Sequence, residues 1–347
     1  MGLNRKLLVF GFSFSSIGGP LALVGQFLEN VNPFEVVLSV LIFSPITFLV
    51  YYSMNKVWDK GGLYDYVVKF TPKLSSYFLY FWFFSYFLYL SYTVDYIVYY
   101  ILNLDGFTAI LLTIGIAGSI AMITLLDREL EFLFVSAIIQ MLFILPINWH
   151  LKFMNPYELS FTNILSTSLL YICITLTPFI GNGSKEGINS VILAYLITGA
   201  ILFLDSFFNI PKIIYLISSF STFSLIVVEF YSLKSVLSKF SIKSRKYLVL
   251  GFLGFTLTSL INPYMYYIYT IVPSLTALYI SLIIFFISMT FSIRNELKLL
   301  GFISLGLIAY GLYSSLQLSS YYLLLEQIII IIIIGVIPLL KNRLFYQ

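Results

Sequence analysis

The sequence predicts an all-α polytopic membrane protein. Of its 347 residues, 60% are hydrophobic and 10% are charged, whereas soluble domains carry about 25% charged residues. The mean hydropathy is +0.98. These few charges cannot cover a globule of this size with a polar surface. Much of the surface must therefore face lipid.

Long apolar segments fill most of the chain. A membrane-spanning helix needs roughly 20 apolar residues, and about twelve segments fit. Met1–Lys6 leads directly into the first of them without a small-residue cleavage site, so we expect no cleaved signal peptide. The expected segments are 7–28, 34–54, 76–102, 107–126, 130–149, 163–182, 189–208, 211–233, 247–262, 266–291, 299–316 and 320–340.

The basic residues predict the orientation of these segments. If the N-terminus is cytoplasmic, all 19 lysines and arginines except Lys152 and Lys212 lie on one side of the membrane. An excess of Lys and Arg marks the cytoplasmic face. We therefore expect a multi-pass protein of the cell membrane with both termini in the cytoplasm.

Two segments contain helix-breaking residues at membrane depth. The first is GFSFSSIGGPLALVG (11–25) and the second is TLTPFIGNGSKEG (175–187). Such breaks are tolerated where protein or a watery cavity lines them. Their segments run in opposite directions, which is typical of the binding site of a transporter built from inverted repeats. Small residues that only allow close helix packing are the alternative.

The stretch 53–87 resembles the amino acid–polyamine–organocation (APC) permeases. Gly61, Gly62, Tyr64, Tyr66 and Pro72 match that family's G-G-x-Y-x-Y element and the following proline turn. FSFSSIGGPLALVG lies where the family has its G-S-G-I break in helix 1, and TPFIGNGSKEG where it has F-x-G in helix 6. FYSLKSVLSKF (230–240) lies where those permeases have the basic end of helix 8. The resemblance covers roughly residues 7–300.

The resemblance implies a five-plus-five inverted repeat with discontinuous helices 1 and 6. The transporter core would be residues 1–300, with repeats at about 7–150 and about 163–291. Residues 299–347 would add two helices and a short cytoplasmic tail. The sequence departs from the family after the second break, where only Asn182–Gly187 precedes Ile188 and the second half of helix 6 is shortened or absent.

The first break is expected to bind a substrate carboxylate. An unwound helix exposes backbone N–H groups where its second half begins, and the helix dipole there favours negative charge. Pro20 is suited to a first helical turn because it loses no needed hydrogen bond. The expected residues are Ser15, Ser16, Ile17, Gly18 and Gly19.

The second break is expected to bind a substrate ammonium group through exposed carbonyls. The resemblance implies that Phe179 closes the pocket as an aromatic gate, and ordinary packing is the alternative for a chain with 34 phenylalanines. The expected residues are Thr177, Phe179, Ile180 and Gly181.

Four residues are candidates for ion coupling. One proton-coupled branch of the family has a lysine in helix 5 where Gln140 stands here, and a neutral amide cannot supply that charge. The hydroxyls of Ser221 and Thr222, with carbonyls of the first segment, would suit a sodium ion; bonds back to their own helix are the alternative. Glu229 is the fourth candidate, and coupling to protons, coupling to sodium and exchange all stay open.

Acidic residues in or near the spans are Asp95, Asp205, Glu229 and Glu326. We expect Asp95, Glu229 and Glu326 to lie at the membrane interface or in ion pairs, with a proton-carrying role as the alternative. The single Cys173 and the single His150 support neither disulfides nor a metal centre.

The sequence therefore predicts a permease for amino acids or related amines, working by alternating access without cofactors. We expect a small-molecule substrate and lipid as partners, no nucleic acid, and no enzyme activity. A non-transporting sensor or subunit with the same fold is an alternative that the shortened helix 6 favours. A membrane enzyme is less consistent with a chain that lacks clustered acids, histidines or cysteines, and no Walker motif indicates ATP-driven transport.

Overall fold

The computed structural model describes residues 4–18, 22, 31–146, 149–152, 159–240, 245–317 and 320–344. Within these ranges the chain is helical and has no strand, and Leu151 and Phe208 form an isolated β-bridge. The α-helices are α1 (Arg5–Ser16), α3 (Pro33–Lys56), α4 (Leu63–Phe70), α5 (Pro72–Asp95), α6 (Gly106–Leu125), α7 (Glu129–Phe143), α8 (Phe161–Leu169), α9 (Asn189–Asp205), α10 (Lys212–Lys239), α11 (Arg245–Ser259), α12 (Pro263–Ser292), α13 (Lys298–Gln317) and α14 (Tyr321–Leu344). A π-helix η1 (Tyr96–Ile101) and 3-10 helices η2 (Leu170–Ile180) and η3 (Asn295–Leu297) extend or join them.

Seven helical stretches in the described residues are long and apolar enough to cross a membrane. They comprise α3, α6, α8 with η2, α10, α12, η3 with α13, and α14 up to Pro338. The expected class, an all-helical multi-pass membrane protein, is therefore confirmed. Helices α1, α7, α9 and α11 coincide with expected segments but have 12 to 17 residues, and the twelve-span inverted repeat stays a prediction.

Local sequence explains where two of the long helices begin. Asn32 and Glu35 form a reciprocal capping box at the start of α3, and Pro33 occupies its first turn, where its missing N–H is not needed. The second Glu35 oxygen accepts the Ser160 N–H at 2.7 Å, which ties α3 to the start of α8. The Asn262 side chain accepts the Met265 N–H and so caps α12 without a reciprocal bond, and Pro263 follows it. The ninth and tenth expected segments therefore separate here.

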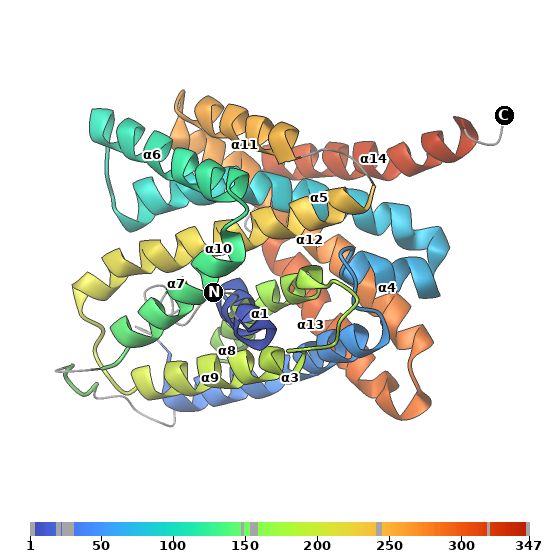
Figure 1. Ribbon diagram of the computed structural model, residues 1–347, viewed down its shortest axis with the longest axis horizontal. Coiled ribbons are helices and arrows are strands. Elements are labelled where there is room, and N and C mark those ends of the chain that lie inside the picture. The colour runs from blue at the N-terminus through green and yellow to red at the C-terminus, as the bar shows by residue number, and fades with distance from the viewer. Residues whose placement is uncertain are drawn as a thin grey trace.

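Helix α1 lies near the centre of the molecule (Figure 1) and packs against α7, α9, α10 and η2. On the other side of α10, the long helices α5 and α12 pack against each other. Helix α14 lies at the periphery (Figure 1), and its isoleucines Ile328, Ile329, Ile332 and Ile333 are exposed, as expected for side chains that face lipid. The breaks expected from the sequence therefore lie on central, buried elements.

Candidate functional site

The first break lies where α1 stops. Helix α1 ends at Ser16, and Gly18 has φ +85°, a conformation that glycine adopts without steric cost. The N–H groups of Ile17 and Gly18 donate back to Ser13 O and Ser15 O at 3.3 and 3.0 Å. These two amides are therefore occupied, and a carboxylate site here would depend on Gly19, which lies outside the described residues.

The second break is a change of helix type followed by a loop. After α8, the chain tightens into η2, an 11-residue 3-10 helix, although such runs rarely exceed 3–4 residues. Residues 181–188 are described throughout and contain no helix, and Gly183 and Gly187 both have positive φ. Segment 6 is therefore not two half-helices: the second half is absent, because α9 begins directly after this glycine-containing loop.

The two breaks meet through a pair of hydroxyl groups. Ser16 Oγ lies 3.3 Å from Thr177 Oγ1, and Ser16 Oγ also donates to Ser13 O at 2.7 Å. Both residues are fully buried. Ser15 is buried as well, and its hydroxyl has no hydrogen-bond partner among the described residues.

A cavity of about 420 Å³ adjoins the end of α1. Ile17 and Gly18 line it, so these two expected binding residues face a partly open cavity. Its polar lining is mainly hydroxyl groups, and the rest is apolar. The side chains that contribute hydroxyl or thiol groups are Tyr89, Tyr92, Thr93, Tyr96, Ser166, Cys173, Thr222, Tyr267, Tyr279 and Ser314.

The last residues of the second break do not line this cavity. Phe179 is fully buried and stacks on Trp82, with ring centroids 4.3 Å apart. The Ile180 carbonyl accepts a hydrogen bond from Arg5 Nη2 at 2.5 Å. Gly181 lies against Trp58 and Asp59. Of the residues expected around this break, Thr177 has a hydroxyl within hydrogen-bond distance of the first break. Phe179 is packed where a gate was expected.

The loop 58–62 occupies carbonyls that were expected to bind an ammonium group. Trp58 Nε1 donates to Pro178 O at 3.1 Å, and the Gly183 N–H donates to Trp58 O at 2.9 Å. The Arg5 guanidinium also lies 5.9 Å from the centre of the Trp58 ring. Sequence reasoning missed Arg5 and Trp58, because their role depends on contacts between segments far apart in the chain.

Three of the four ion-coupling candidates lie near the end of α1. Ser221 Oγ contacts Gly18 O and lies 2.6 Å from Gln140 Oε1. Gln140 Nε2 donates to Ser136 Oγ at 2.9 Å, and Ser136 Oγ lies 2.5 Å from Ser224 Oγ. This chain of buried polar groups joins α1, α7 and α10.

The Ser221 hydroxyl has one proton and therefore cannot donate to Gly18 O and Gln140 Oε1 together. Turning the amide of Gln140 by 180° places Nε2 toward Ser221, whose hydroxyl then donates to Gly18 O. In the other orientation, three oxygen atoms face one another with one proton between them, and they would have to move apart to hold a cation. Thr222 lines the cavity and donates to Ser218 O of its own helix at 3.1 Å.

Asp95, Asp205 and Glu229 are buried without an ion pair among the described residues, whereas ion pairing was one of the expectations for Asp95 and Glu229. Asp95 is buried in the last turn of α5 and accepts a hydrogen bond from Ser259 Oγ at 2.8 Å. Glu229 is fully buried, and neither carboxyl oxygen has a hydrogen-bond partner in the described part of the chain. The same holds for both oxygens of Asp205. Ion pairing of Asp95 and Glu229 is therefore not found in the described residues, and their expected place at the membrane interface stays a prediction.

Ion pairs of the described residues gather on the face that contains Lys60 and Lys234. Lys234 pairs with Asp127 at 3.1 Å and with Glu129, and Arg245 also pairs with Asp127. The hydrogen bond from Arg245 holds the pKa of Asp127 below its ordinary value. Lys60, Asp127, Glu129 and Lys234 line a cavity of about 400 Å³ that reaches Gly181.

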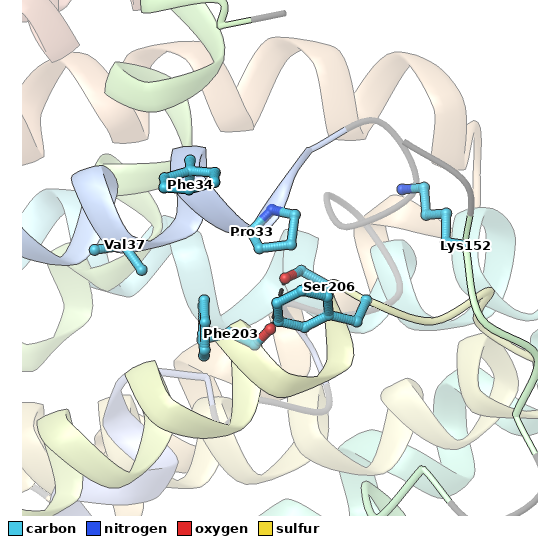
Figure 2. Close-up of a pocket in the computed structure, with 7 residues that line it drawn as sticks. Pro33, Phe34, Val37, Lys152, Phe203 and Ser206 are labelled. Carbon is cyan, nitrogen blue, oxygen red and sulfur yellow. Dashed lines mark hydrogen bonds between the residues drawn. The ribbon is translucent and has the colours of Figure 1, made fainter. Parts of the chain in front are cut away.

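A third cavity, of about 440 Å³, lies between the start of α3 and the end of α9 (Figure 2). Pro33, Phe34, Val37 and Phe203 surround it, with Lys152 at one edge (Figure 2). None of the residues expected to bind substrate or ions lines it. The tyrosine-lined cavity at the end of α1 is therefore the candidate site.

A scan against protein-family models gives no match for this chain, and a search of curated proteins gives none. The geometry of the candidate site is therefore the basis for inferring function. One sequence signal would have located the cavity earlier: Tyr89, Tyr92 and Tyr96 follow one another at intervals of three and four residues. That spacing places them on one helical face.

Proposed function

We propose that this protein is a secondary-active permease for amino acids or related amines that works by alternating access. The observation that carries the proposal is the contact between Ser16 and Thr177, which joins the end of α1 to η2 beside the tyrosine-lined cavity. Interrupted helices that meet at a buried cavity are the typical substrate site of secondary transporters. The proposed location is the cell membrane, with both termini in the cytoplasm.

The arrangement beside this cavity suggests how the permease is closed on one face. Arg5 holds the Ile180 carbonyl, and Trp58 holds the Pro178 carbonyl. Under the proposed orientation these contacts lie on the cytoplasmic side, between the cavity and the cytoplasm. Alternating access then requires them to separate, while the opposite side closes.

The polar chain around Ser221 is the proposed coupling element. Gly18 O, Ser221 Oγ and Gln140 Oε1 provide oxygen ligands of the kind that sodium prefers. If sodium binds there, uptake should depend on sodium and should fall in Ser221→Ala. Ser219→Ala is the matched control, because that hydroxyl lies on the same helix and donates to Leu216 O.

Uptake of labelled amino acids and amines into proteoliposomes tests the proposal. Gly18→Leu should abolish uptake, because a side chain at φ +85° is strained and would enter the cavity. Gly181→Leu should abolish it by separating Trp58 and Asp59 from η2, since an added Cβ would lie 2.5 Å from Asp59 O. A folded wild-type protein that takes up, exchanges or binds no member of a broad panel would contradict the permease proposal.

The absent second half of segment 6 favours one other function, a sensor or subunit with a permease-like fold. Such a protein would bind ligand in the same cavity without moving it. Binding measured in detergent together with an absence of uptake and exchange in proteoliposomes would support this alternative. Binding with uptake would exclude it.

A further inference from the structure

Glu229 is an unusual group for the interior of a membrane protein. It lies on α10 with a fully buried side chain, and both of its oxygens lack hydrogen-bond partners among the described residues. An isolated ionised carboxylate is very costly to bury, and such a group takes a proton unless a cation is beside it. Ionisable residues inside membrane-spanning segments are rare, and they mark ion or substrate pathways and proton relays.

The groups that face Glu229 are aromatic or neutral. Electrostatic interactions link it to Tyr86, Tyr89 and Tyr92 on α5 and to Cys173 on η2. The charged groups on the other elements packed against α10 lie elsewhere. Arg5 of α1 interacts with Tyr231 and Glu186, and Glu129 of α7 pairs with Lys234.

Glu229 lies next to the floor of the tyrosine-lined cavity. Leu225 lines the cavity and precedes Glu229 by one helical turn, about 6 Å along α10. Cys173 and Tyr89 line the cavity and interact with Glu229. Glu229 itself does not line the cavity, so a bound cation would reach the carboxyl by displacing side chains that do.

The tyrosine-lined cavity is suited to an organic cation. Tyrosine rings attract ammonium groups through their faces, and the attraction is larger where water is excluded. Tyr89, Tyr92, Tyr96 and Tyr267 all line the cavity, and its lining among the described residues contains no lysine or arginine. A bound ammonium group would have tyrosine rings around it and one carboxylate as its counter-ion.

We propose that Glu229 binds either a proton or the ammonium group of an organic cation, one at a time. The inference deepens the proposed function and depends on it. When the cation enters, the O–H bond of the carboxylic acid breaks, the proton leaves to solvent, and the carboxylate pairs with the cation. The site is neutral both when the carboxyl is protonated and when the carboxylate pairs with the cation, so neither state buries an unpaired charge. Transport is then the exchange of a cation for a proton.

Proton release on binding tests this inference directly. The probe is benzyltrimethylammonium, because it has a permanent charge and neither carries a proton nor crosses lipid as a neutral base. Calorimetry of the full-length protein in detergent, in two buffers of different ionisation enthalpy, counts the protons released. We expect about one proton per bound cation, and affinity that rises about tenfold per pH unit where the free carboxyl is protonated.

Glu229→Gln keeps the shape of the protonated side chain and should fold, which size-exclusion chromatography and thermal unfolding would verify. It should release no proton and bind the cation at least tenfold more weakly, without pH dependence. Asp205→Asn is the matched control, because it removes another buried carboxyl without partners in the described residues. It should behave as the wild type does.

Three results would overturn the inference: binding without proton release, proton release that survives in Glu229→Gln, and no binding of the probe at millimolar concentration. Uptake of labelled phenylalanine into proteoliposomes, measured on the same preparation, separates this failure from failure of the permease proposal. Uptake with any of the three results leaves the permease proposal standing and removes the exchange at Glu229.

Discussion

Gly62 faces the ring of Phe179 so closely that an added Cβ would lie 2.6 Å from the ring atom Cδ1. Its backbone angles are φ 56° and ψ −125°, a region that is almost restricted to glycine. The ring of Phe179 in turn stacks on Trp82. The glycine pair that precedes Tyr64 therefore connects α4 to the end of η2 through close backbone packing.

Gly62→Ala should destabilise the protein by about 2–4 kcal/mol, because strain at this backbone conformation and contact with Phe179 add together. Gly106→Ala is the control: it also has positive φ but no atom within 4 Å of an added Cβ, and should cost about 1 kcal/mol. Thermal unfolding in detergent measures both. If Gly62→Ala destabilises the protein as much in a Phe179→Leu background as in the wild type, contact with the Phe179 ring is not the cause of the destabilisation.

Ser221→Ala should destabilise the protein by about 1–3 kcal/mol, because it leaves buried polar groups of Gly18 and Gln140 without a partner. The effects of Ser221→Ala and Gln140→Ala should not add, since residues in one hydrogen-bond network couple by about 0.5–3 kcal/mol. A double-mutant cycle followed by thermal unfolding measures the coupling. Additive effects would show that the two side chains act independently.

The helical class was predictable because it depends on composition alone, whereas the inward faces of the helices were not. A membrane helix is apolar toward lipid and toward its neighbours, so the hydrophobic pattern does not reveal which side is buried. Gln140 and Ser221 were singled out separately from the sequence. The sequence placed Ser221 near carbonyls of the first segment, and it contacts Gly18 O there. Its contact with Gln140 depends on helix rotation, which only the structure provides.

The second break shows a different limit of sequence reasoning. Pro178, Gly181 and Gly183 marked the end of the helix correctly, since η2 ends at Ile180. The apolar run 170–177 has no feature that distinguishes a 3-10 helix from an α-helix. The positions of Phe179 and Ile180 also could not be predicted, because they depend on Trp82 and Arg5, which are distant in sequence.

Lys234→Ala should destabilise the protein in a pH-dependent way. Burial raises the pKa of Glu129 from its ordinary value of 4.5, and the hydrogen bond and charge of Lys234 oppose that rise. A raised folded-state pKa contributes stability that is present at low pH and lost as pH rises through that pKa. Removing Lys234 raises the pKa of Glu129 further, so Lys234→Ala should lose more stability at neutral pH than at low pH.

We expect Lys234→Ala to lower the free energy of unfolding by roughly 2–3 kcal/mol at neutral pH. This is less than breaking a fully buried ion pair costs, because Lys234 is 18% exposed. The difference from the wild type should narrow as the pH falls toward 4.5. Thermal unfolding across this range measures it. Arg128→Ala is the control, since its pair with Glu131 is exposed, and should leave the unfolding temperature unchanged. A loss for Lys234→Ala that is the same at all pH values would exclude Glu129 as its cause.

The proposed orientation predicts which loops an impermeant reagent can reach in intact cells. Because Cys173 is the only cysteine, a Cys173→Ser background leaves introduced cysteines as the sole targets. Asp105 and Lys60 are both exposed in the structure, and the distribution of basic residues places them on opposite sides of the membrane. Asp105→Cys should therefore react with an impermeant maleimide in intact cells, whereas Lys60→Cys should react only after the membrane is permeabilised. The reverse pattern would place both termini outside the cytoplasm, and labelling of both in intact cells would show that the segments between them do not cross the membrane as proposed.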